Sequence, residues 1–461
     1  MSGRGRDQLR GNKIIGAGIS GILALSLAAC GSSAPAAGGG QTAAGGSPAP
    51  ANEASKAEAP KKADPITLTF VVPNTTTTQP YVDIFKKYEE KTGNKVEIQA
   101  LPSGEDYGRL LLTRFATKDY PDLFQMDPGT KQYVKFRADE ELYDFTNEDF
   151  LNRMTDSIKQ FQTLNGKVYG IPWGSSGGMG FYYNKDVFKK LSVEVPNNYK
   201  DLLAILDKAK AAGITPIYEG VKDAWPVQVF SLAGWSTFID PVIGKEGVDK
   251  IERNELKLAD IPQLKEVLQR QHELKTKGYF QNSLLAGTYD EQQNLFGNGS
   301  VAMVLQLEGM LPALAKKFGE DFVRTKVGFF PMPSDTDKGQ ATITPPNQFL
   351  VSKNGKKAKA AVELIKFMTT KEALDIWYKA NPGVPVYKEA TAQLYPAQED
   401  VVKYTQAGKA QVNIKNRLTA SMVDYDKILQ NMFINGNIDE AIKQIDEKYR
   451  KDGANKKLPG F

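Results

Sequence analysis

The chain is organised around the segment from Gly166 to Phe188, which reads G-K-V-Y-G-I-P-W-G-S-S-G-G-M-G-F-Y-Y-N-K-D-V-F. Its apolar run 168–171 predicts a short β-strand that ends at Pro172, which has no N–H to donate to a ladder. Five glycines lie within residues 170–180, so the backbone there can turn sharply or approach a ligand closely. The run 181–183 predicts a second strand. We interpret the segment as a crossing between two halves of the protein, while a glycine-rich loop between two strands of one sheet remains an open alternative.

The same segment carries a family resemblance. Its pattern G-K-x-Y-G-I-P-x, followed closely by Y-Y-N-K-D-x-F, resembles the extracellular solute-binding proteins that feed ABC importers, in the family that includes maltose-binding and multiple-sugar-binding proteins. In that family this is the first strand to cross from the N-terminal lobe to the C-terminal lobe. The resemblance implies an α/β fold of the two-lobed, type II periplasmic-binding-protein kind. Its discontinuous lobes would be joined by a hinge, with a ligand cleft between them.

Length, charge and cysteine content narrow the class of protein. With 461 residues, 41% of them hydrophobic, the chain can bury a sizeable core and is too long for one ordinary domain. The formal net charge is +5, but four basic residues and one acidic residue in the first 29 positions account for +3 of it. The near-balance of the remainder predicts no binding of nucleic acid or of an anionic membrane surface. The single cysteine, Cys30, excludes an intramolecular disulfide.

The N-terminus has the features of a secretory signal. Its basic start is followed by an apolar run of 16 residues, 14–29, which is short for a membrane span and typical of a signal-peptide core. The run ends in L-A-A-C, which resembles the lipoprotein box and implies that residues 1–29 are removed and that Cys30 becomes the lipid-modified first residue. An ordinary signal with a chance cysteine is the alternative. Residues 30–64 are rich in Ala, Gly, Ser and Pro, a composition that predicts a flexible linker.

After the predicted linker, predicted strands alternate with predicted helices. This alternation predicts a sheet with helices on both faces, and ligands of such sheets sit beyond the carboxyl ends of the strands. Asn74 follows the first strand and Asp127 follows the third, so both are candidate ligand-binding residues. The expected elements are strands at 66–72, 96–101 and 123–126 and helices at 80–91 and 107–116.

The third strand, P-D-L-F-Q-M-D, also resembles a family strand whose terminal carboxylate takes ligand hydroxyls. By residue-type correspondence, the resemblance points to Asp127 and Gln125. The alternative is that Asp127 only caps the turn at Pro128 and Gly129. Ser175, in the glycine-rich crossing, is a further candidate for ligand binding.

Three tryptophans are candidates for stacking on a sugar ring. Trp225 follows a strand predicted at 214–217 and resembles in its position a family aromatic that stacks on sugar, while Trp173 and Trp235 are secondary candidates. An aromatic face against the C–H face of a pyranose combines apolar burial with a directional contact. For each tryptophan, packing in a core is the alternative.

Glu308 is the last candidate for the ligand site. It ends an apolar strand within residues 296–310, which resemble the family's F-x-x-G-x-x-A-M strand. Because an isolated buried carboxylate is costly, Glu308 is either a binder of hydroxyls at the cleft edge or an exposed loop acid. Members of the family often have tryptophan shortly after the following glycine, whereas Met310 and Leu311 stand here.

The later chain extends the resemblance. Residues 346–352 resemble the second crossing, which returns to the first lobe, and residues 353–377 resemble a family helix with an apolar stripe and a solvated lysine face. We expect the N-terminal lobe to comprise residues 65–172 plus 341–390 and the C-terminal lobe to comprise residues 173–340 plus 391–461.

Two features of the sequence would fit an enzyme instead of a binding protein. The motif G-x-S-x-G at 174–178 would need a strand–turn–helix context and a late histidine, but the only histidine is His272. Asp127 and Glu308 could form a glycosidase pair from two lobes, although a hinged pair is a poor way to hold a catalytic distance.

We therefore predict a monomeric surface lipoprotein, not an enzyme, that captures a carbohydrate and delivers it to an ABC permease. We expect the carbohydrate to be an oligosaccharide. No cofactor and no metal site are expected. The alternatives are a surface-anchored glycoside hydrolase and a binding protein for a non-sugar solute.

Overall fold

The computed structural model describes residues 64–461, apart from 103–104, 156–157 and 159–161. The predicted signal peptide, Cys30 and nearly all of the predicted linker lie outside the described residues, so the lipid anchor stays a prediction. Residues Ala63–Phe461 belong to one unit. Within the described part, no helix combines the length and the apolar character that a membrane span requires.

The first β-sheet has the strand order β2-β1-β3-β12-β6. β1, β2 and β3 run parallel, whereas β12, from a much later part of the chain, is antiparallel to both β3 and β6. β6 therefore runs in the direction of β1, and the carboxyl ends of β1, β3 and β6 meet at one edge. The strands are β1 (Thr67–Pro73), β2 (Lys95–Leu101), β3 (Leu123–Met126), β6 (Gly170–Pro172) and β12 (Gln348–Val351).

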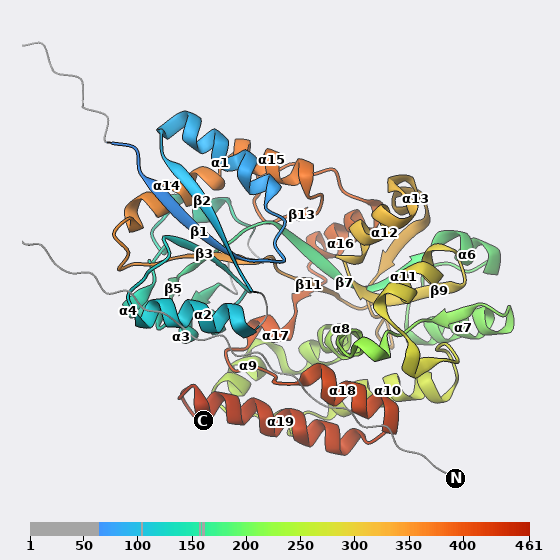
Figure 1. Ribbon diagram of the computed structural model, residues 1–461. Coiled ribbons are helices and arrows are strands. Elements are labelled where there is room, and N and C mark those ends of the chain that lie inside the picture. Colours follow the sequence, from blue (N-terminus) through green and yellow to red (C-terminus); the bar gives the residue numbers. More distant parts are fainter. Residues whose placement is uncertain (1–63, 103–104, 156–157, 159–161) are drawn as a thin grey trace, which may run out of the picture. The chain divides into compact units, whose positions relative to one another are not determined.

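Helices cover both faces of this first sheet (Figure 1). Phe70 of β1 packs with α1, α14 and α15 on one face, whereas its neighbour Val71 packs with α2 on the other. Such strands are apolar on both sides because helices bury both faces. The alternation of strands and helices predicted for residues 66–126 is confirmed. The helices are α1 (Gln79–Thr92), α2 (Glu105–Ala116), α3 (Lys131–Lys135), α4 (Ala138–Glu141), η1 (Asp149–Arg153), α14 (Ala358–Met368) and α15 (Lys371–Ala380).

The second sheet is built around β7 (Ser175–Asn184). Its main order is β14-β11-β7-β9-β8, and β10 and β13 also pair with β7. β7 is antiparallel to all four of its partners, so one strand joins most of the second half of the protein. The other strands are β8 (Thr215–Ile217), β9 (Val301–Leu307), β10 (Val327–Phe330), β11 (Ala341–Thr344), β13 (Val384–Pro385) and β14 (Ala410–Val412), and β4 (Thr163–Leu164) pairs separately with β5 (Lys167–Val168).

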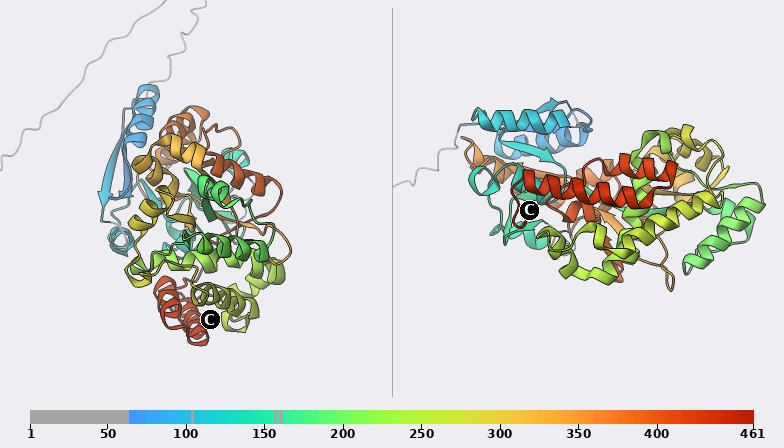
Figure 2. Two further views of the ribbon diagram at one scale, coloured as in Figure 1. Left: turned by 90° about the vertical axis from the view of Figure 1, so that its right-hand side faces the viewer. Right: turned by 90° about the horizontal axis from the view of Figure 1, so that it is seen from below.

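Helices pack on both faces of the second sheet as well. Phe181 of β7 lies in a core with α7, α8 and α10, whereas Tyr182 lies in a core with α11, α12 and α16. The C-terminal helix α19 lies against α10 and α18 (Figure 2). The helices are α6 (Lys185–Leu191), α7 (Tyr199–Ala211), α8 (Gln228–Gly234), α9 (Asp240–Glu252), α10 (Pro262–Thr276), α11 (Tyr289–Gly297), α12 (Met310–Phe318), α13 (Glu320–Lys326), α16 (Pro396–Gln406), α17 (Ile414–Arg417), α18 (Tyr425–Asn435) and α19 (Ile438–Asn455), with short turns η2 (Val221–Asp223), η3 (Trp225–Val227), η4 (Trp235–Ile239), η5 (Leu258–Asp260) and η6 (Leu284–Ala286).

The chain changes sheets between β6 and β7 and again between β11 and β12. Gly174, in the first connection, has φ +105°, a conformation that glycine adopts without steric cost. The second connection is residues 345–347. The predicted boundary at residue 341 lies at the start of β11, which still pairs with β7, so the chain leaves the second sheet only after Thr344. The residue ranges of the two lobes otherwise remain a prediction.

The glycine-rich part of the first crossing is a strand rather than a loop. The sequence predicted a strand only from residue 181, whereas β7 starts at Ser175. A Cβ at Gly178 would lie 2.3 Å from Val401 Cγ2, and one at Gly180 would lie 2.7 Å from Phe329 Cε2. These glycines therefore let α16 and β10 pack directly against the backbone of β7.

Residues 353–377 differ from the single predicted helix, because they form α14 and the first part of α15. The chain breaks at Thr370, whose Oγ1 accepts the N–H of Ala373 at 3.5 Å and so caps α15. The apolar stripe of α14 packs on the first sheet as predicted. Trp377 belongs to α15, the helix that begins after this break, and lies at the edge of that sheet.

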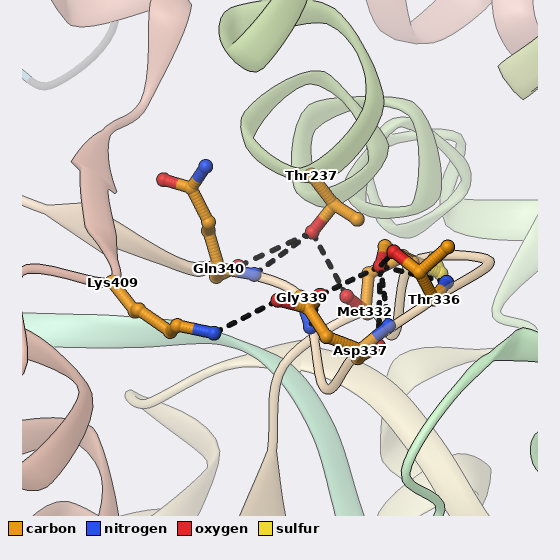
Figure 3. A network of polar contacts seen from close by, with 8 residues as sticks. Thr237, Met332, Thr336, Asp337, Gly339, Gln340 and Lys409 are labelled. Carbon is orange, nitrogen blue, oxygen red and sulfur yellow. Dashed lines mark hydrogen bonds and ion pairs between the residues drawn. The ribbon is translucent and has the colours of Figure 1, made fainter.

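The loop between β10 and β11 is held by a polar network (Figure 3). Thr237 Oγ1 donates a hydrogen bond to Met332 O at 2.8 Å and accepts one from the N–H of Gln340 at 3.1 Å. Lys409 donates to Asp337 at 2.8 Å, and this contact holds the pKa of Asp337 down to about 2. Hydrogen bonds and an ion pair therefore hold this loop in place between β10 and β11, two strands that pair with β7.

Candidate functional site

A pocket of about 630 Å³ lies at the edge where β1, β3 and β6 end. Residues 75–77 and 125–127 line it from the ends of β1 and β3, and the two crossings contribute residues 173–175 and 345–347. The pocket therefore lies beyond the carboxyl ends of the strands, as expected for an α/β sheet. Helices and the residues after them add Tyr81, Tyr107, Gln132, Lys135, Trp377 and Asn381 to the lining.

Three aromatic side chains line the pocket together. The rings of Trp173 and Trp377 meet at 64° with centroids 5.8 Å apart, and the ring of Tyr81 lies 4.9 Å from that of Trp377. Behind them, Trp173 stacks on Phe349 of β12 at 28° and 5.8 Å. These contacts fix the indole rings, so a ligand would meet a preorganised aromatic corner.

Four polar atoms of the pocket residues are buried without a hydrogen-bond partner in the described part of the chain. They are two donors, Trp173 Nε1 and Trp377 Nε1, a hydroxyl, Ser175 Oγ, and an acceptor, Gln132 Oε1. Buried polar atoms are nearly always hydrogen-bonded in proteins, and an unpaired one costs about 1–3 kcal/mol. Their concentration in one pocket indicates a ligand that offers both acceptors and donors.

The two polar candidates of β3 both line the pocket. Gln125 is buried, and its Oε1 accepts a hydrogen bond from Thr76 Oγ1 at 3.5 Å. Asp127 is exposed, and its main-chain oxygen accepts a bond from Gln348 Nε2 at 2.9 Å. Among the described residues, the Asp127 carboxylate has no hydrogen bond or ion pair, so it does not cap the turn that follows and stays available to a ligand.

Asn74 lies next to this lining rather than in it. The side chain is exposed between Pro73 and Thr75, both of which line the pocket. Its N–H donates a hydrogen bond to Leu101 O at 2.7 Å, which ties the end of β1 to the end of β2. A ligand role for Asn74 remains a prediction.

Trp235 and Trp225 lie outside the pocket lining. Trp235 is 1% exposed in the core of the second half, and its Nε1 donates to Asp240 Oδ1 at 3.0 Å. Packing and this bond account for the position of Trp235 in the core, and its ligand role remains a prediction. Trp225 is partly buried against Tyr289, with centroids 4.9 Å apart at 69°, and its ligand role remains a prediction.

Glu308 is buried instead of exposed at a cleft edge. Its Oε2 accepts the N–H of Gly178 at 2.9 Å, and its Oε1 accepts Gln398 Nε2 at 2.8 Å. Burial raises the pKa of Glu308 to about 7, although both hydrogen bonds lower it. Because these contacts join β9, β7 and α16, Glu308 is a structural carboxylate and does not form a glycosidase pair with Asp127 across the pocket.

The other chemical motifs also find structural explanations. In the G-x-S-x-G motif, Ser176 lies within β7, where its Oγ donates to Val384 O at 3.3 Å, so the strand–turn–helix context of a nucleophile elbow is missing there. His272 lies in α10, and its ring packs closely against Gly436. A Cβ at Gly436 would come 2.7 Å from His272 Cε1. In the described part of the chain, no three His, Cys, Asp or Glu side chains gather as metal ligands.

Sequence reasoning missed Tyr81, Gln132 and Trp377. Tyr81 lies within the helix predicted at 80–91, and Trp377 ends the stretch 353–377 that the sequence predicts as one helix. Apolar periodicity assigns such aromatics to a core, and Tyr81 and Trp377 do pack on the core while also lining the pocket. The Thr-Thr beginning of α15 was the local signal that could have separated Trp377 from the helix before it.

Comparison with known proteins gives the same fold. Residues 83–409 match the family model described as bacterial extracellular solute-binding protein. An uncharacterised ABC transporter extracellular-binding protein of Pyrococcus horikoshii is 26% identical over 388 residues, which cover 80% of this chain and 83% of that one. A multiple sugar-binding protein of Streptococcus mutans is 24% identical over 302 residues, covering 64% and 69%. The solved apo structure of RafE from Streptococcus pneumoniae superposes with a TM-score of 0.71 at 18% identity, covering 86% and 99%.

Proposed function

Since the chain belongs to the bacterial extracellular solute-binding proteins, we propose that it captures a carbohydrate in the pocket at the end of the first sheet and delivers it to the permease of an ABC importer. Its family places the site of action outside the cytoplasm. We further propose that an oligosaccharide is the ligand, that Cys30 carries a lipid anchor, and that the protein acts as a monomer.

The observation that carries this proposal is the chemistry of the pocket. A pyranose presents apolar C–H faces and a rim of hydroxyls that both donate and accept. The corner of Trp173 and Trp377 offers faces for the former, and their two indole N–H groups, Ser175 Oγ and Gln132 Oε1 offer partners for the latter. The exposed carboxylate of Asp127 adds an acceptor for hydroxyl donors. The Streptococcus mutans relative is named as a multiple sugar-binding protein, and a further relative is also named for the sugars that it binds. Both names support a sugar ligand.

The test is a thermal-shift screen of the full-length chain, purified in detergent, against neutral and acidic oligosaccharides. A ligand that binds only the native state must raise the melting temperature, by an amount set by its concentration relative to Kd. We expect a hit to lose about 1–3 kcal/mol of binding free energy, roughly 5- to 150-fold in Kd, in Trp377→Ala, because stacking and apolar burial are lost.

The matched control is Phe367→Ala, which removes a partly buried aromatic of α14 that does not line the pocket. Its melting temperature should fall while Kd for the hit stays unchanged. The carbohydrate assignment fails if the whole panel leaves the melting temperature unmoved. It also fails if Trp377→Ala and Phe367→Ala bind a hit equally well.

A further inference from the structure

Gln348 lies between two of the strand ends that form the pocket edge. It is the first residue of β12, where it pairs with Met126 at the end of β3 and with Pro172 at the end of β6. Its side chain is buried and is not part of the pocket lining, although Asn347 directly before it is. A buried amide needs partners for its oxygen and for both of its N–H groups.

The N–H groups of Gln348 hold the loop that leads from β3 into α3. Its Nε2 donates one hydrogen bond to Asp127 O at 2.9 Å and another to Gly129 O at 3.0 Å. Residues 127–129 belong to no helix or strand, so these bonds fix backbone that no helix or sheet ladder holds. The conformation of this loop therefore depends on a side chain from β12.

The oxygen of the same amide is held as well. The Tyr133 hydroxyl shares its proton between Gln348 Oε1 at 3.2 Å and Gln162 Oε1 at 2.8 Å, and it accepts the N–H of Gly170 at 2.9 Å. A Cβ at Gly170 would lie 2.0 Å from Gln348 Oε1, so glycine leaves the room that the amide occupies. Because α3 and β6 enclose the oxygen, both N–H groups of the amide point at the loop.

The loop links the pocket to the second half of the chain. On one side, Asp127 lines the pocket with an exposed side chain. On the other side, a Cβ at Gly129 would lie 2.7 Å from Asn416 O. Next to this contact, Thr130 Oγ1 lies 3.5 Å from Thr419 Oγ1. A candidate ligand-binding side chain and a contact with the other half therefore belong to one short stretch of backbone.

We propose that Gln348 is a positioning residue, which holds residues 127–129 so that Asp127 faces the ligand while Gly129 stays against the second half. The proposal rests on the proposed function and adds to it a buried residue that does not touch the ligand. A ligand on Asp127 and the contact at Gly129 then stabilise the same loop conformation, so each favours the other. Without Gln348, binding must include the free energy of ordering the loop.

The first test needs no ligand. Hydrogen exchange, followed by mass spectrometry on the full-length chain in detergent, compares the parent with Gln348→Met, which removes both N–H groups and keeps the length of the side chain. We expect the amides of residues 129–134 and 414–419 to exchange about 5- to 100-fold faster in the variant, the range for the loss of two hydrogen bonds.

The matched control is Gln292→Met. Gln292 is buried in α11 outside the pocket lining, its Nε2 donates to Tyr218 O at 2.7 Å, and its Oε1 accepts Gln306 Nε2 at 2.9 Å. Both variants should lower the melting temperature, because each leaves buried polar atoms unpaired. Only Gln348→Met should change exchange in the two segments.

The second test measures binding of raffinose, stachyose, maltotriose and chitotriose by calorimetry. For a saccharide that the parent binds, Gln348→Met should raise Kd about 5- to 50-fold, whereas Gln292→Met should leave it within about twofold. In the Asp127→Ala background, Gln348→Met should have almost no further effect, because the side chain that it positions is gone. A role in stability alone would not produce this non-additivity.

The two tests fail independently. Unchanged exchange in Gln348→Met, or an equal rise in Gln292→Met, overturns the inference whatever the protein binds. Additive effects of Gln348→Met and Asp127→Ala on Kd overturn it too, while the carbohydrate function stands. If none of the four saccharides binds, the proposed function and the role of Gln348 toward a ligand fail together, and exchange alone then decides whether Gln348 holds the loop.

Discussion

Replacing Glu308 by glutamine should remove a large part of the pH dependence of stability. In the folded protein, burial raises the pKa of this carboxyl to about 7, against about 4.5 for an ordinary glutamate. The fold therefore favours the protonated acid, and its contribution to stability is fully present below about pH 4.5 and is lost as the pH rises through 7. At about 1.4 kcal/mol for each pKa unit, the parent should lose on the order of 3 kcal/mol between pH 4.5 and pH 8 from this group.

Glutamine has nearly the same shape and cannot ionise, but Gly178 N–H and Gln398 Nε2 are both donors, so the single amide oxygen can accept from only one of them, and this loss is the same at every pH. The stability of Glu308→Gln relative to the parent should therefore rise by about 2–3 kcal/mol between pH 5 and pH 8. The assay is urea unfolding of the full-length chain at both pH values. The exposed Glu194→Gln serves as the control for a change of charge alone.

Other titrating groups affect the parent and the variant alike, so the difference between them isolates Glu308. Glu219 is one such group, since burial raises its pKa to about 8. Parallel unfolding free energies for parent and Glu308→Gln across this pH range would show that Glu308 is already ionised in the fold at pH 5. Burial without a counter-charge would then not hold this carboxyl in its protonated form.

Asp127→Ala should weaken binding of a saccharide hit by about 1–3 kcal/mol in calorimetry, because ligand hydroxyls lose their acceptor, while the melting temperature without ligand stays within error because the side chain is exposed. Gly178→Ala should cost about 1–3 kcal/mol in urea unfolding, since the new Cβ would lie 2.3 Å from Val401 Cγ2, and Val401→Ala in the same chain should recover part of that loss. Cys30→Ser should move the protein from the membrane to the soluble fraction of cells without changing Kd for the hit, and retention in the membrane would count against a lipid anchor.

The first half of the fold could be predicted from local patterns because its strands and helices follow each other directly. β3 (Leu123–Met126) has the predicted bounds. The extent of β7 could not be found in this way. Its glycines look like a loop in isolation, and only the close approach of Val401 and Phe329 explains why a strand needs them.

The candidate site was found in part, and the difference has a physical cause. Gln125 and Asp127 end a strand, and Trp173 and Ser175 lie on the predicted crossing, so topology alone brings them to one edge. Trp377 reaches that edge through α15, which starts only at Lys371, so no local pattern records its contact with the earlier residues. Trp235 and Glu308 do not line this pocket. Their residue types suited a ligand, but the hydrogen bonds to Asp240 and Gly178 already satisfy them.

The pocket and the connections between the two sheets share residues, and this links binding to conformation. Residues 173–175 and 345–347 line the pocket and also join the sheets. The first connection is anchored by Tyr387, whose hydroxyl donates to Pro172 O at 3.0 Å, and by Tyr378, whose hydroxyl donates to Gly174 O. A rotation of one sheet against the other must therefore change the backbone that presents Trp173 and Ser175 to the ligand. Because a ligand shifts a conformational equilibrium only by its difference in affinity for the two states, contacts made by the connecting segments themselves are well placed to supply that difference.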